Sequence, residues 1–186
     1  PKEIAWPKDY AGERWRAGRK AVSEERNFDD VVREHGPMIA RIAASHEARS
    51  HLAEELVQEI WFAVWRALPT FRGDSSLRSF VARIAGNRAA THAAKAVRVP
   101  KSDEVDEALP TPGDDPETAA VASDRQARLL AAVRELPLVS RQAVTLTLEG
   151  FGPGEIAAAL GISANAVSIR LSRAKDQLRN LMGESE

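Results

Sequence analysis

The chain has 186 residues, a hydrophobic content of 44% and a formal net charge of −1. This length predicts one or two domains, and the hydrophobic content is ample for a core. The absence of cysteine excludes disulfide bonds and thiolate metal sites. No apolar run is long enough to cross a bilayer, and the start of the chain, PKEIAWPKDY, lacks the apolar core of a signal peptide. We therefore expect a cytoplasmic protein without direct membrane insertion.

Charged residues gather in blocks of one sign. The stretch from Arg72 to Lys101 holds seven basic residues and one acid, Asp74. The stretch that follows, up to Asp124, is rich in acids, and the C-terminal part is basic again. Two basic blocks separated by an acidic one suggest two nucleic-acid surfaces and a spacer that avoids them.

Residues 1–24 form a polar and irregular N-terminal extension in which Trp6, Tyr10 and Trp15 stand out. Two interpretations stay open for this extension. It is a partly disordered arm, or its aromatic side chains dock on the body of the protein or on a partner.

The first domain is predicted over residues 25–97 and consists of helices. They run from Phe28 to about Ser45, from His51 to Leu68 and from Leu77 to about Val97. Gly36-Pro37 predicts a kink or a break in the first helix, and Pro69 ends the second. The loop before the third helix has Gly73 at its turn.

A linker is predicted over residues 98–116, where prolines and acids leave little to bury. A flexible linker of this length means that the two flanking domains need not touch. The second domain, residues 117–186, begins with a helix that Pro137 breaks. Ser140 is expected to cap the next helix, which Gly150 ends.

The C-terminal part predicts a helix-turn-helix. Its first helix would run from about Pro153 to Leu160, Gly161 would end it in the left-handed conformation, and Ser163 would cap the second helix. The second helix carries basic residues on its outer face, which suits the major groove of DNA. Helical hairpins with a charged outer face also occur in proteins that never touch DNA. No segment alternates like a strand, so the fold class is all-α, with two small helical domains.

Four motifs follow one another along the chain: ELVQEIWFAVWRAL, then FRGDSSLRSFVARIAGNRA, an acidic Pro-rich linker, and LPLVSRQAVTLTLEGFGPGEIAAALGISANAVSIRLSRAKDQLR. In this order the chain resembles the bacterial extracytoplasmic-function sigma factors, the shortest members of the sigma-70 family, over about residues 25 to 182. The resemblance implies partners and activity. Members join core RNA polymerase, recognise two elements of promoter DNA and help to open the duplex. An anti-sigma factor, often tethered to the membrane, commonly holds them inactive.

The resemblance also implies three sets of site residues. Polymerase binding is assigned to Glu55, Leu56, Gln58, Glu59 and Trp61. Recognition of the minus-ten region is assigned to Phe71, Asp74, Ser76, Arg78, Arg83, Asn87 and Arg88. Recognition of the minus-35 region is assigned to Ser163, Asn165, Ser168, Arg170, Ser172, Arg173 and Lys175. Ser168 departs from the family pattern, since relatives often have Lys or Arg there. Phe80 is expected to be a core residue, and an acidic helix face is often only solvated.

Nothing in the sequence argues for catalysis, a cofactor or a metal. His46 and His51 are five residues apart, which is poor spacing for one helical face, and there is no HExxH pattern. Two other functions stay open. In the first, the chain is a stand-alone helix-turn-helix regulator, which normally needs a dimer interface that is not obvious here. In the second, it is an adaptor or decoy that binds an anti-sigma factor.

Overall fold

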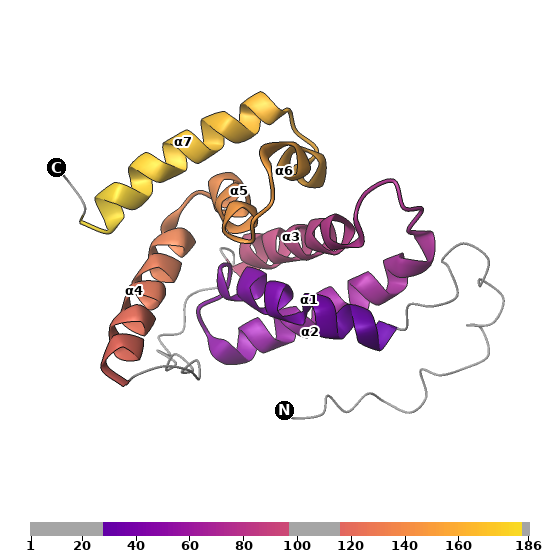
Figure 1. Ribbon diagram of the computed structural model, residues 1–186, viewed down its shortest axis with the longest axis horizontal. Helices are drawn as coiled ribbons and strands as arrows, with labels where there is room; N and C mark the ends of the chain where they lie inside the picture. Colours follow the sequence, from indigo (N-terminus) through magenta and orange to yellow (C-terminus); the bar gives the residue numbers. More distant parts are fainter. Residues whose placement is uncertain (1–27, 97–115, 184–186) are drawn as a thin grey trace.

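The computed structural model describes residues 28–96 and 116–183. The described residues form helices and no strand (Figure 1), which confirms the all-α prediction. The predicted N-terminal extension and residues 98–115 of the predicted linker lie outside this part of the chain. None of the helices described is long and apolar enough to cross a bilayer.

The first three α-helices pack against one another. They are α1 (Phe28–Ala44), α2 (Ser50–Ala67) and α3 (Leu77–Ala96), with a 3-10 turn, η3 (Leu68–Thr70), after α2. α1 continues through Pro37, so the predicted break is absent, whereas a kink there stays a prediction. Met38, Ile39 and Ile42 bury the turns on the C-terminal side of Pro37. Gly73 has a φ of 80°, as its predicted place at the turn requires.

The remaining helices form the C-terminal part of the fold. They are α4 (Pro116–Glu135), α5 (Leu138–Leu148), α6 (Pro153–Leu160) and α7 (Ala164–Leu181). The prediction that Ser140 caps α5 was wrong. The helix begins directly after Pro137, whose carbonyl accepts hydrogen bonds from the backbone N–H groups of Ser140 and Arg141, each at 2.9 Å. Ser140 therefore lies inside the first turn and is buried.

The helix-turn-helix has the predicted local geometry. Gly161 ends α6 with a φ of 66°, a conformation that a side chain would strain. The hydroxyl of Ser163 accepts a hydrogen bond from the backbone N–H of Ala166 at 3.2 Å and so caps α7. Ile156 and Val167 are fully buried between the two helices.

The two helical groups touch each other. α3 packs against α5 and α6, and in Figure 1 it lies between the α1 and α2 pair and these two helices. One apolar cluster runs from Val31 and Ile60 in the first group to Leu146 and Ile156 in the second. A smaller cluster joins α4, α5 and α7. A long linker permits separate domains, but apolar surface on both groups is buried by bringing them together.

Candidate functional surfaces

The first candidate surface is the outer face of α2. Glu55, Gln58 and Glu59 are all exposed, so a partner can reach them. Leu56 and Trp61 are only 0% and 3% exposed and belong to the core. The motif that brought these five residues together therefore mixes an exposed polar face with the buried apolar face that supports it.

Phe62 was missed from this surface. Its side chain is 43% exposed, it stacks on Trp65 with ring centroids 6.0 Å apart, and the guanidinium of Arg66 lies 5.9 Å from its ring. Helical spacing was the available signal, because Phe62 follows Glu59 by three residues and Glu55 by seven. Phe62 therefore adds an apolar side chain to the exposed face that carries Glu55 and Glu59.

The second candidate surface is the loop between η3 and α3. Asp74 and Ser76 are exposed, whereas the ring of Phe71 packs on that of Phe80 with centroids 5.0 Å apart. Phe80 is 7% exposed, which confirms it as a core residue. The hydroxyl of Ser76 accepts a hydrogen bond from the backbone N–H of Ser79 at 3.0 Å and caps α3. Ser76 therefore already has a structural role.

Further polar side chains continue this surface along α3. Arg83 and Asn87 are exposed and one helical turn apart, and Arg88 beside them is half-buried. The guanidinium of Arg83 lies 5.6 Å from the ring centroid of Phe80, which holds it near the loop. These positions give the surface positive charge over about one and a half turns of helix.

Arg78 differs from its neighbours because it contacts the C-terminal helices. Its guanidinium donates a hydrogen bond to the backbone carbonyl of Glu149 and lies 4.3 Å from the ring centroid of Phe151. Nothing in the sequence pattern links residues so far apart in the chain. This contact lies at the junction of the two helical groups.

The third candidate surface is α7. The exposed members of the predicted set are Ser163, Asn165, Ser168, Ser172, Arg173 and Lys175, and Arg170 is half-buried. The hydroxyl of Ser168 donates to the carbonyl of Ala164 at 3.2 Å. Two guanidinium groups on a helix that a capped turn presents to solvent are suited to contacts with guanine edges in a major groove.

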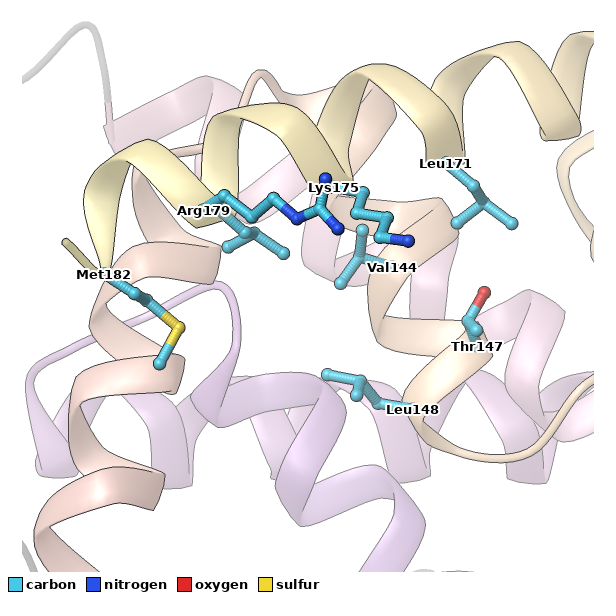
Figure 2. Close-up of a pocket in the computed structure, with 8 residues that line it drawn as sticks. Val144, Thr147, Leu148, Leu171, Lys175, Arg179 and Met182 are labelled. Carbon is cyan, nitrogen blue, oxygen red and sulfur yellow. The ribbon is translucent and has the colours of Figure 1, made fainter. Parts of the chain in front are cut away.

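A groove between α5 and α7 lies beside this surface. It is lined by Val144, Thr147, Leu148, Leu171, Lys175, Leu178, Arg179 and Met182. Figure 2 shows Lys175 and Arg179 along one side of the groove and Leu148 on the other. Arg170 and Arg173 are not among its lining residues. Lys175 therefore lies over the groove, apart from the two arginines with which the sequence grouped it.

A buried polar cluster lies where α1 ends. The carboxylate of Glu47 accepts hydrogen bonds from the side chain of Arg49 and pairs with His92, each at 3.0 Å. Burial alone would raise the pKa of Glu47, but these hydrogen bonds lower it to about 2. Burial lowers the pKa of His46 to about 4. Among the described residues no three His, Cys, Asp or Glu side chains are arranged to hold a metal ion.

A helix-turn-helix that presents cations to solvent, joined to a helical group with an acidic face and a basic helix, is typical of a DNA-binding protein. The chain matches the family models for Sigma-70 region 2 over residues 31–99 and for Sigma-70 region 4 over residues 126–178. It belongs to the extracytoplasmic-function sigma factors of the sigma-70 family. These proteins direct core RNA polymerase to specific promoters and assist promoter melting.

Individual relatives support this placement. RNA polymerase sigma factor NccH of Alcaligenes xylosoxydans is 30% identical over 175 residues, which cover 91% of this chain and 94% of that protein. The ECF RNA polymerase sigma-E factor of Escherichia coli K12 is 31% identical, with 87% and 90% covered. The structure of CnrH in complex with the cytosolic domain of CnrY superposes with a TM-score of 0.63 at 26% identity, and 86% of this chain and 89% of that one are covered.

Proposed function

We propose that three separate surfaces of this sigma factor divide its work. The outer face of α2 binds core polymerase, the loop before α3 and the start of α3 read the minus-ten region, and α7 reads the minus-35 region. The observation that carries this proposal is the capped, exposed α7 with Arg170 and Arg173, within a segment that matches sigma-70 region 4. The chain supplies binding energy and position, and the polymerase supplies the chemistry.

The polymerase surface is assigned to Glu55, Gln58 and Glu59, with Phe62 as its apolar anchor. The carboxylates would guide the encounter with a basic partner surface. The exposed aromatic ring would bury apolar area in the contact. Leu56 and Trp61 act from beneath by fixing the position of the helix in the core.

The minus-ten surface is assigned to the exposed polar residues of the loop and of α3. Asp74 and Ser76 would contact the edge of an unstacked base, and Arg83, Asn87 and Arg88 would hold phosphates or a base edge. Phe71 is half-buried against Phe80, so it would form a wall of the base pocket rather than a free stacking platform.

The minus-35 surface is assigned to α7. Arg170 and Arg173 would contact guanine edges, and Asn165, Ser168 and Ser172 would add base or phosphate contacts. Ser163 contributes through the cap that fixes the start of the helix. Lys175, over the groove, would bind a phosphate or a protein partner.

An anti-sigma factor is the further partner that we propose. One similar solved structure holds the sigma factor RpoE in complex with the anti-sigma factor NepR from Bartonella quintana. CnrH was likewise solved in complex with another protein, the cytosolic domain of CnrY. In the cell the chain would be cytoplasmic, or held at the membrane by that partner.

A run-off transcription assay with purified core polymerase and a promoter library tests the proposal. The double variant Arg170→Ala/Arg173→Ala should lose at least about tenfold of promoter-specific output, because one bidentate contact between arginine and guanine is worth roughly 1–3 kcal/mol. It should bind core polymerase like the unmodified chain. The matched control is Arg125→Ala/Arg128→Ala, which removes two exposed arginines from α4. Unchanged promoter output from the first variant would count against α7 as the reading helix.

A further inference from the structure

Ile169, on the helix that we assign to the minus-35 region, is an isoleucine outside the core. It is 45% exposed, whereas Ile39, Ile60 and Ile156 are fully buried. A β-branched residue is also a weaker helix former than alanine, leucine or lysine. Neither core packing nor helix formation therefore explains an isoleucine here. Single apolar residues are common on protein surfaces, so the position of Ile169 on α7 has to show what it does.

Ile169 lies on the side of α7 that is opposite to the core. α7 buries Val167 and Ala174 against its neighbours. With 3.6 residues per turn, Ile169 lies about 160° around the helix from Val167 and about 140° from Ala174. Figure 2 shows Leu171 and Lys175 beside the groove between α5 and α7, and Ile169 is not among the residues that line this groove. The isoleucine therefore belongs to the outer, solvent side of the helix.

The outer side of α7 carries polar residues on either side of Ile169. Asn165 precedes it by four residues and Arg173 follows it by four, and both are exposed. The row from Asn165 to Arg173 is about 12 Å long at a rise of 1.5 Å per residue. That length corresponds to about three to four base pairs of 3.4 Å each. A partner along this row meets an amide, a branched apolar side chain and a guanidinium, in that order.

The major-groove edge of DNA carries one apolar group that fits the middle of this row, the C5-methyl group of thymine. The other three bases present polar atoms there, and a polar atom against an isoleucine loses its hydrogen bond to water without a replacement. An apolar protein partner would call for a wider apolar patch, whereas the residues one turn away on both sides are polar. The row therefore suits base edges, with thymine opposite Ile169.

We propose that Ile169 is a specificity-determining residue of this sigma factor: its side chain contacts the C5-methyl group of a thymine in the minus-35 region, beside the base that Arg173 contacts. The inference rests on the proposed function of α7 and adds to it one base and the residue that selects this base. Apolar atoms alone make the contact. Its contribution therefore stays constant as salt is added, whereas contacts to phosphates weaken.

The first experiment selects promoters from a library that is randomised over the minus-35 region, with core polymerase assembled on each variant of the chain. Sequencing of the bound promoters should show thymine enriched at one position for the unmodified chain. Ile169→Ser should lose this preference alone, and Ile169→Val, which keeps a branched apolar side chain, should retain it. Leu181→Ser is the matched control, because it removes an exposed apolar side chain from the last residue of the same helix. An element without an enriched thymine would overturn the inference.

The second experiment removes the methyl group from the DNA and leaves the protein unchanged. Deoxyuridine pairs with adenine as thymidine does and lacks only the C5-methyl group. At the enriched position this exchange should weaken binding by the complex of core polymerase and the unmodified chain about fourfold, the effect of one methyl group that is no longer buried. The ratio should not change with salt concentration. The complex with Ile169→Ser should bind both duplexes equally well. An equal loss for both chains would mean that the methyl group acts through the duplex, and the contact would be refuted.

The outcomes separate this inference from the proposed function. If Arg170→Ala/Arg173→Ala abolishes the base preferences in the minus-35 region and Ile169→Ser keeps the preference for thymine, α7 recognises the element and the Ile169 contact is refuted. If Ile169→Ser weakens binding to all members of the library equally, the residue takes no part in base selection, and the inference is overturned as well. If no substitution in α7 changes any preference, the assignment of α7 fails together with the inference drawn from it.

Discussion

Gly161 determines the angle of the helix-turn-helix by its backbone conformation alone. Its φ is 66°, and a Cβ atom at this position would meet nothing within 4 Å. The cost of a side chain here is therefore one of backbone strain and not of collision. Gly154, the second residue of α6, offers a contrast, because it is equally free of neighbours and has no positive φ.

We expect Gly161→Ala to lower the free energy of unfolding by about 1–2 kcal/mol, the cost of the left-handed conformation for an alanine. Gly154→Ala should be neutral or stabilise by up to about 1 kcal/mol, since it removes freedom from the unfolded chain. Urea denaturation of both variants measures the difference. Equal stabilities would mean that the turn relaxes to accept the side chain.

The exposure and the contacts of other single residues depend on tertiary packing. Leu56 and Glu55 are neighbours in one motif, yet one is fully buried and the other exposed. Arg78 was predicted as a DNA contact from a motif, and its contact with Glu149 joins residues 71 positions apart. No local pattern encodes such a pairing, because it depends on how α3 packs against the end of α5.

At the scale of elements, the sequence predicted most of what the structure contains. Apolar periodicity gave the helices and their order, and the pairing of Gly161 with the Ser163 cap gave the turn between α6 and α7. The errors come from tertiary packing. Buried residues carry α1 through Pro37, and Pro137 begins α5 before Ser140 could act as a cap. In α2 the structure shows that Glu55 is exposed and Trp61 is buried, a difference that the motif alone does not give.

The exposed face of α2 yields a test that belongs to this element. Glu55→Ala/Gln58→Ala should weaken binding to core polymerase at least about tenfold, because it truncates two side chains at the centre of the proposed contact. Surface plasmon resonance with immobilised core polymerase measures the change, and circular dichroism checks that helix content is kept.

The matched control for α2 is Gln126→Ala/Glu135→Ala, which removes an amide and a carboxylate from exposed positions of α4. It should leave polymerase affinity unchanged. If both double variants lose affinity equally, the effect is one of overall charge and the α2 face is not the specific site.

At the scale of the whole molecule, the two predicted domains share one apolar cluster. The linker composition predicted freedom between the domains, and the sequence had no signal for the junction. Its polar members, Arg41, Glu149, Ser45 and Thr145, come from helices that are far apart in the chain. The composition of the linker permits the two helical groups to move apart, whereas the burial of complementary surfaces brings them into contact.

The cluster at the end of α1 makes stability depend on pH. His46 is buried, and its pKa of about 4 lies below the ordinary 6.5, so its contribution to stability is present above pH 6.5 and is lost as pH falls toward 4. The pKa of Glu47 is about 2 against an ordinary 4.5, so its contribution is present above pH 4.5 and is lost between there and pH 2.

The melting temperature should therefore fall continuously as the solution is acidified below pH 6.5, first through His46 and, below pH 4.5, also through Glu47. The slope from His46 alone is at most about 1.4 kcal/mol per pH unit. His46→Gln should remove the fall between pH 6.5 and pH 4.5 and keep the fall below pH 4.5, and thermal melts followed by circular dichroism from pH 7 to pH 3 check this. A melting temperature that stays constant between pH 6.5 and pH 4.5 in the unmodified chain would contradict the prediction.

Arg78 donates its hydrogen bond to the main-chain oxygen of residue 149, and this has a consequence for evolution. Every amino acid carries that oxygen, so the residue at position 149 can change in a descendant while the arginine keeps its hold. Two descendants would then retain the same contact with no covariation between positions 78 and 149. A search for paired substitutions would pass over it, and a superposition of backbones would find it at once.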